Sequence, residues 1–125
     1  MPVRFNIDHA KRYVEAHAEG ETGLEDFEQF LDAIVMQGAL SYRKLVDSRR
    51  AIGRLSDQDI MMLGARMSAY TGNLEPRGPI AFIVATPSPS NLPTRVVNLA
   101  RADRPAKVFL DEDEARTWLA AQREV

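Results

Sequence analysis

The sequence predicts one α/β domain over residues 1–125, with a mixed, mainly parallel sheet of about five strands and about four helices. Strand patterns alternate with helical patterns along the chain, which is typical of parallel sheets with helical crossovers. The segment at 79–85, Pro-Ile-Ala-Phe-Ile-Val-Ala, is almost wholly apolar and suits a central strand covered on both faces. A length of 125 residues corresponds to one domain with enough chain to bury a core.

The first two elements form a predicted β-hairpin. Apolar and polar residues alternate over Val3–Asp8, which is the pattern of a half-buried strand. Asp8-His9-Ala10 supplies turn residues, and a second alternating strand follows over Lys11–Ala18.

The first helix is predicted from Thr22-Gly23-Leu24-Glu25, which has the pattern of a capping box. In this pattern the Thr22 hydroxyl accepts from a free backbone N–H, and Glu25 reaches back to the cap. Apolar residues then recur at helical spacing, and Gly38 marks the end of the helix.

The middle of the chain continues the alternation. Tyr42–Val46 is predicted as a short strand that ends in Asp47, and a basic loop follows it. A second helix opens at Ser56 with another capping pattern and closes at Gly72. After the strand at 79–85 comes a loop rich in serine and proline.

Three short elements complete the order β-β-α-β-α-β-α-β-α. We expect a third helix over Thr94–Arg101 and a strand over Lys107–Leu110. Asp111 then caps the last helix, with Glu114 at its third position and an inward face that includes Trp118 and Leu119.

Composition argues against most enzyme classes. The chain has no cysteine and only two histidines, so thiolate metal sites and a three-histidine zinc site are excluded. Neither a Gly-x-Ser-x-Gly elbow nor a nucleotide-binding glycine motif occurs. We therefore expect a protein that is not an enzyme and needs no metal or cofactor.

Charge and hydropathy limit the classes of partner that we expect the protein to bind. The formal net charge of −2 argues against nucleic-acid binding. No apolar stretch reaches the roughly 18 residues of a membrane helix, and the alternating N-terminus is unlike a signal peptide. These features predict a cytoplasmic protein without membrane contact.

Several segments together resemble the STAS superfamily (sulfate transporter and anti-sigma factor antagonist), and most closely its SpoIIAA-like branch of small bacterial proteins. The segments are residues 22–32, 44–47, 55–60, 78–85 and 108–119. The resemblance implies a SpoIIAA-like fold and a regulatory role through contact with a protein partner, such as a kinase or another regulator. A homodimer is a further partner that the sequence leaves open.

The resemblance also points to Ser56. In antagonist-type members, a serine or threonine at the start of the second helix is phosphorylated by a partner kinase, and this breaks partner binding. The usual motif is Asp-Ser-Ser-Gly, whereas here Leu55 precedes the serine and Asp57-Gln58 follow it. Ser56 is therefore a phosphorylation candidate, and the simpler alternative is that it only caps the helix.

A second kind of site is an anion pocket. Loops at the carboxyl ends of parallel strands gather at one edge of a sheet, where ligands commonly bind. Two basic or hydroxyl-rich segments belong to that edge, and their arginine forks and hydroxyls suit a phosphate, nucleotide or carboxylate. The candidates are Ser48, Arg49, Arg50, Arg54, Ser88, Ser90 and Arg95.

Two functions thus remain open. The first is a non-enzymatic regulatory or protein-interaction module of STAS type, controlled by phosphorylation. The alternative is a protein that binds a small anionic ligand with the loops at the carboxyl edge of its strands.

Overall fold

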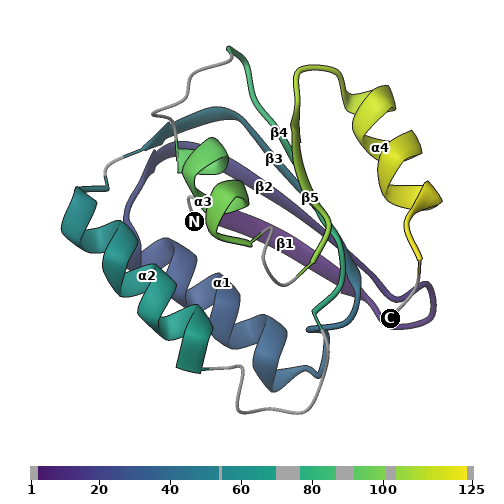
Figure 1. Cartoon of the computed structure of the whole chain (residues 1–125), viewed down its shortest axis with the longest axis horizontal. Coiled ribbons are helices and arrows are strands. Elements are labelled where there is room, and N and C mark those ends of the chain that lie inside the picture. Colours follow the sequence, from purple (N-terminus) through teal and green to yellow (C-terminus); the bar gives the residue numbers. More distant parts are fainter. Residues whose placement is uncertain (1–2, 54, 70–76, 87–91, 101–103, 124–125) are drawn as a thin grey trace.

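A computed structural model describes residues 3–53, 55–69, 77–86, 92–100 and 104–123. The elements, labelled in Figure 1, are β1 (Val3–Asp8), β2 (Tyr13–Thr22), α1 (Leu24–Met36), β3 (Arg43–Gly53), α2 (Asp57–Ala69), β4 (Ile80–Ile83), α3 (Leu92–Ala100), β5 (Ala106–Phe109) and α4 (Glu112–Ala121). The predicted element order is confirmed. Among the described residues, no helix combines the length and the apolar character needed to cross a membrane.

The five strands form one sheet in the order β1-β2-β3-β4-β5. β1 pairs antiparallel with β2, and every other pairing is parallel, so the predicted mixed and mainly parallel sheet is confirmed. Crossovers between parallel strands are right-handed. Because successive strands here are also neighbours in the sheet, α1, α2 and α3 all lie on one side, and only α4 lies on the other (Figure 1).

The sheet therefore has two separate cores. On the α1 side, the alternate residues Val14, Ala16 and Ala18 of β2 pack under Phe30 and Ile34 of α1. On the α4 side the core is smaller, and it consists of Leu45, Ala81, Ile83, Phe109, Ala115 and Leu119. The segment at 79–85 was predicted to be covered on both faces, and its Phe82 and Val84 are both buried.

The start of α1 differs from the prediction. Thr22 is the last residue of β2, and its hydroxyl donates to the Ile52 carbonyl (3.4 Å) instead of capping the helix. Gly23 is the N-cap, and its N–H donates to the carboxylate of Asp26 (2.9 Å) rather than to Glu25. The predicted Thr22 cap is wrong because β2 runs four residues further than its alternating pattern indicates, and this places Thr22 in the sheet.

The same extension changes the basic segment. β3 continues to Gly53, so the loop predicted after Asp47 is wrong. Residues 50–53 pair with residues 19–22 of β2, beyond a register shift between His17 and Glu19. β3 holds one extra residue there, which is the geometry of a β-bulge. Long parallel pairing thus converts the segment that contains Ser48, Arg49 and Arg50 into strand.

The other helix boundaries agree closely with the sequence. Gly38 follows α1 with φ of 68°, a left-handed conformation that glycine adopts without strain. At α4, Asp111 is the N-cap and accepts from the Glu114 N–H (3.0 Å), as predicted. Gly72, the predicted end of the second helix, lies outside the described residues.

A buried lysine joins the loop after α1 to the middle of the sheet. The side chain of Lys44 on β3 is only 2% exposed. Its ammonium donates to the carbonyls of Leu40 (2.7 Å) and Tyr42 (2.8 Å). These charge-assisted hydrogen bonds compensate part of the cost of burying the charge.

Candidate functional site

Ser56 is the N-cap of α2. The Asp59 N–H donates to Ser56 Oγ (3.1 Å), and the Ser56 N–H donates to the Asp59 carboxylate (3.0 Å). This reciprocal pair is a capping box, and it confirms that the sequence pattern at Ser56 starts a helix. The Ser56 side chain is also exposed, so it is accessible to an enzyme.

An arginine from another element lies beside this helix start. Arg95, in the first turn of α3, donates to the carboxylate of Asp57 (2.9 Å). Asp57 directly follows Ser56, and its side chain is 90% exposed. The structure therefore brings Ser56 and Arg95 to the same end of α2, although 39 residues separate them in the sequence.

The outer face of α2 carries two exposed methionines close to Ser56. Met61 is 75% exposed and Met62 is 50% exposed, whereas Ile60 and Leu63 on the inner face are buried. Methionine is flexible and polarisable, and surfaces that bind varied protein partners use it often. The first turns of α2 thus combine a modifiable hydroxyl with an apolar contact surface.

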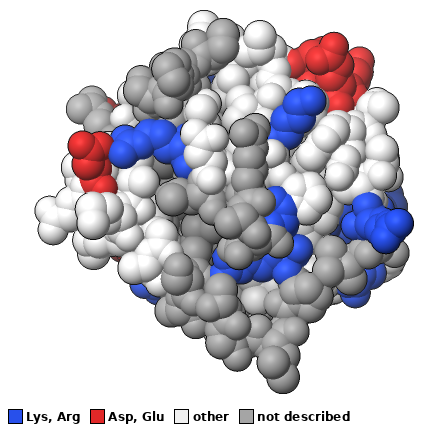
Figure 2. Space-filling view, viewed as in Figure 1, with Lys and Arg blue, Asp and Glu red and all other residues white. Residues whose placement is uncertain are grey.

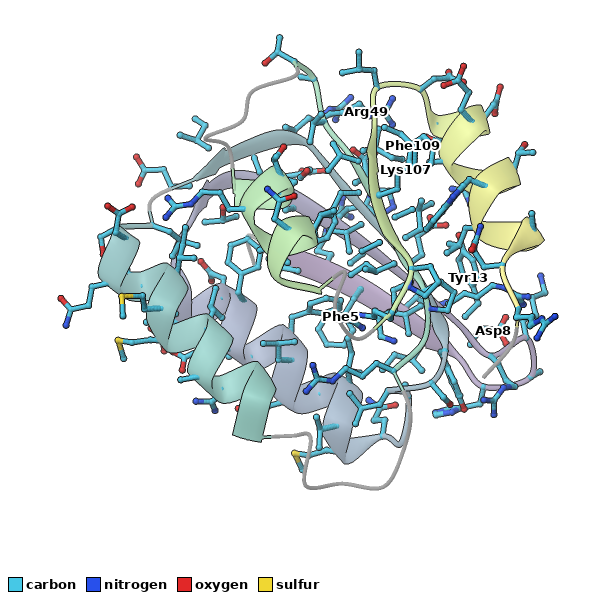
Figure 3. All side chains as sticks on the ribbon, viewed as in Figure 1. Phe5, Asp8, Tyr13, Arg49, Lys107 and Phe109 are labelled. Atoms are coloured by element: carbon cyan, nitrogen blue, oxygen red, sulfur yellow. The ribbon has the colours of Figure 1, made fainter. Side chains whose placement is uncertain are left out.

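The basic segment of β3 is engaged within the protein. Ser48 Oγ donates to the Ile83 carbonyl of β4 (2.8 Å). The Arg49 guanidinium pairs with Asp47 (2.7 Å) and with Glu112 of α4 (2.9 Å). Figure 3 shows Arg49 at the same end of the sheet as Phe109 and the start of α4. Arg50 lies opposite Glu19 in the strand pairing.

These contacts shift the ionisation of both partners at Arg49. The side-chain hydrogen bond from Arg49 lowers the pKa of Asp47, and it outweighs the opposite effect of burial. The same hydrogen bond raises the pKa of Arg49. The Asp47–Arg49 pair is therefore charged at neutral pH, and the second contact of Arg49, with Glu112, ties β3 to α4.

A cavity of about 390 Å³ lies between the sheet and the helices of the α1 side. Ser48, Arg49 and Arg95 are among its lining residues, so three of the predicted anion-binding residues do meet at one place. Arg50 instead borders a groove on the α4 side, together with His17, Asp47 and Glu112. Arg54, Ser88 and Ser90 lie outside the described residues.

A charged network covers the part of the α4 side that α4 leaves open. His17 lies 3.1 Å from the Glu15 carboxylate and 3.8 Å from that of Asp47. Arg116 of α4 pairs with Glu15 (3.0 Å) and with Glu112 (3.0 Å). Burial alone would lower the pKa of Arg116, but these two carboxylates outweigh it and raise that pKa. Within the described residues, no group of His, Asp and Glu is placed to hold a metal ion.

Sequence reasoning missed one residue of the cavity. Arg104 lines it and is only 9% exposed, although it is charged. It precedes β5 and donates to the Gly78 carbonyl (3.4 Å). No local pattern distinguishes Arg104 from the other arginines, because its burial depends on packing between distant segments.

Comparison with known proteins gives a match in structure alone. No protein-family profile matches the chain, and no curated protein resembles it significantly in sequence. An uncharacterised DUF3478-family protein with a SpoIIAA-like fold from Shewanella loihica matches with a TM-score of 0.58 and 22% identity, covering 94% of this chain and 93% of that chain. The chain therefore has a SpoIIAA-like α/β fold.

The second match is to a regulatory protein. The anti-sigma factor antagonist SpoIIAA, in its unphosphorylated form, matches with a TM-score of 0.55 and 15% identity. The alignment covers 96% of this chain and 99% of that chain. Both comparisons confirm the SpoIIAA-like fold that the sequence predicts.

Proposed function

We propose that this protein is a non-enzymatic regulatory module that binds a protein partner through the start of α2, and that phosphorylation of Ser56 controls this contact. One observation carries the proposal: Ser56 is an exposed helix cap within two turns of the exposed Met61 and Met62. The fold shared with SpoIIAA supports a role of this kind.

Phosphorylation would alter this surface in two ways. A phosphate adds about −1.5 to −2 charge at pH 7, which makes an apolar contact surface strongly negative. It also turns the capping hydroxyl of Ser56 into a phosphate ester and places the new charge beside the Asp59 carboxylate. Arg95 already pairs with the neighbouring Asp57, so its guanidinium is placed to receive the phosphate.

The test compares variants in affinity capture from the cells that produce the protein. The variants are Ser56→Ala, Ser56→Glu, the double variant Met61→Asp/Met62→Asp, and a control, Met36→Asp. Met36 is more exposed (85%) than either of these methionines, but it lies at the end of α1. Thermal unfolding of each variant verifies that the fold is intact.

We expect one partner to be captured by the wild type, by Ser56→Ala and by Met36→Asp. Ser56→Glu and the double methionine variant should reduce its capture about tenfold or more, because a charge at the centre of an interface costs more than ~1.4 kcal/mol. Mass spectrometry of the protein from the same cells should detect phosphate on Ser56. Equal capture by the double variant, or loss with Met36→Asp, would exclude this surface.

A further inference from the structure

The cavity on the α1 side has walls of a kind that fits a small molecule. Its volume of about 390 Å³ falls within the range of ligand sites, roughly 300–1,000 Å³. Apolar side chains from four elements face it: Phe30 and Leu31 of α1, Ile60 and Leu63 of α2, Val96 of α3 and Phe82 of β4. Such walls favour a hydrocarbon ligand.

The position of α2 explains why this space is open. Arg66 of α2 pairs with Glu28 (2.7 Å) and Asp32 (2.8 Å) of α1, so α2 is anchored to α1. Figure 1 shows α2 as the outermost helix on this side, with α1 nearer the sheet. Ile60 and Leu63 therefore face the cavity and form its outer wall.

The charge of the lining has one sign. Arg95 and Arg104 line the cavity, and none of its described lining residues is Asp or Glu. The Arg49 guanidinium, which pairs with Asp47 and Glu112, is engaged elsewhere. Figure 2 shows basic side chains spread over the face that carries α2 and α3, with acidic ones near its margins. An apolar cavity with arginine at its border is complementary to a ligand with an apolar body and an anionic end.

Arg95 is the residue best placed for that anionic end. It lies in the first turn of α3, where the helix dipole also favours an anion. Its partner Asp57 is almost fully exposed, and exposed ion pairs contribute little, about 0–1 kcal/mol. A ligand carboxylate can therefore replace Asp57 at Arg95 at little cost.

We propose that this cavity binds a single-chain apolar carboxylate of the medium-chain fatty-acid type, with its tail between α1, α2 and the sheet and its carboxylate at Arg95. The proposal goes beyond the protein contact at Ser56 and shares with it one residue, Arg95, which pairs with Asp57 and also lines the cavity. It narrows the expected phosphate, nucleotide or carboxylate site to an apolar carboxylate, because most of the affinity comes from buried hydrocarbon.

The proposal predicts how affinity depends on the ligand. Each methylene that enters the cavity strengthens binding about fourfold, the ratio that corresponds to ~0.8 kcal/mol. The carboxylate adds a contribution that depends on Arg95. A phosphate ion without a tail gains neither the apolar contacts nor the exclusion of water, so it should not bind.

Isothermal titration of the full chain provides the test, with octanoate, decanoate, decanol and inorganic phosphate below their aggregation limits. We expect one site, about 16-fold tighter binding of decanoate than of octanoate, and about tenfold weaker binding of decanol. Arg95→Gln should abolish the preference for decanoate over decanol. Arg4→Gln, which changes an exposed arginine of β1 that pairs with Glu19, should leave that preference intact.

A second variant tests the tail site. Val96→Phe fills part of the cavity and should weaken decanoate binding at least tenfold, and a thermal melt shows whether the variant is folded. Absence of decanoate binding to the wild type would overturn the proposal. So would equal affinity for decanoate and decanol, binding of phosphate alone, or an unchanged headgroup preference in Arg95→Gln.

Discussion

The two faces of the sheet are covered by helices in different ways. On the α4 side, one helix seats Ala115 and Leu119 directly on Leu45 and Ile83 of the sheet. On the other side, three helices cover the strands, and a cavity of about 390 Å³ lies between them and the sheet. The three helices thus leave a cavity beneath them, whereas the grooves of the α4 side lie beside its single helix.

The two sides of the sheet also differ in how their helices are held in place. The α4 side is reinforced by the ion pairs that Glu112 and Arg116 make with Arg49 and Glu15, so its geometry is tightly constrained. The exposed cap Ser56 and the cavity both belong to α2, which is anchored mainly through α1. The two proposed contacts, a ligand on the inner face of α2 and a partner on its outer face, therefore concern the same helix.

The largest expected effect comes from truncating one leucine on each side. Leu119→Ala should lower the free energy of unfolding by about 2–5 kcal/mol, because Leu119 is fully packed in the α4 core. Leu63→Ala should cost about 2 kcal/mol or less, since Leu63 already borders the cavity. Chemical denaturation of the two variants measures both values, and equal costs would break the comparison.

The ion pairs on the α4 side should make the stability of the fold depend on pH. Hydrogen bonding from Arg49 lowers the pKa of Asp47 in the folded protein. A lowered folded pKa stabilises the fold above the unfolded value, near 3.9, and this stabilisation is lost as the pH falls through the lowered pKa. Asp47→Asn should therefore cost about 1 kcal/mol at pH 7 and show a shallower loss of stability between pH 5 and pH 2.

A double-mutant cycle controls this experiment. In an Arg49→Gln background, Asp47→Asn should have little further effect at pH 7, because the guanidinium that stabilises the charged carboxylate is absent. Denaturation of the four proteins at each pH supplies the cycle. An unchanged effect of Asp47→Asn in that background would show that Arg49 is not the cause.

The smallest effect on global stability should come from the α1–α2 anchor. Arg66→Ala removes partly exposed ion pairs to Glu28 and Asp32 and should lower the unfolding free energy by about 1 kcal/mol or less. Amide hydrogen exchange should accelerate in α2 but not in α4. Equal acceleration in both helices would mean that the two sides of the sheet do not differ in local stability.

Local chemistry predicted much of the fold. The apolar run at 79–85 predicted that β4 lies inside the sheet, and the pair Asp111 and Glu114 predicted where α4 starts. Both predictions were possible because the signals act over a few residues. The length of β3 was not predictable in the same way. Its basic second half lies in the sheet only because β2 also extends to Thr22 and a bulge corrects the register.

The candidate site shows the same division. The cap at Ser56 follows from the spacing of Ser56 and Asp59, which hydrogen bond to each other. The pairing of Arg95 with Asp57 and the burial of Arg104 depend on how distant segments pack. The cavity is likewise invisible in the sequence, since its walls come from helices and strands that are far apart along the chain.

The chemical reactivity of the Lys44 amine reports whether the protein has unfolded. The chain has three lysines, and Lys11 and Lys107 are exposed while Lys44 is enclosed in the core. An amine-reactive reagent therefore meets Lys11 and Lys107 in the native protein and reaches the amine of Lys44 only when the middle of the sheet opens. The extent of modification at Lys44, normalised to that at the two exposed lysines, therefore measures how often the sheet opens, without any engineered probe.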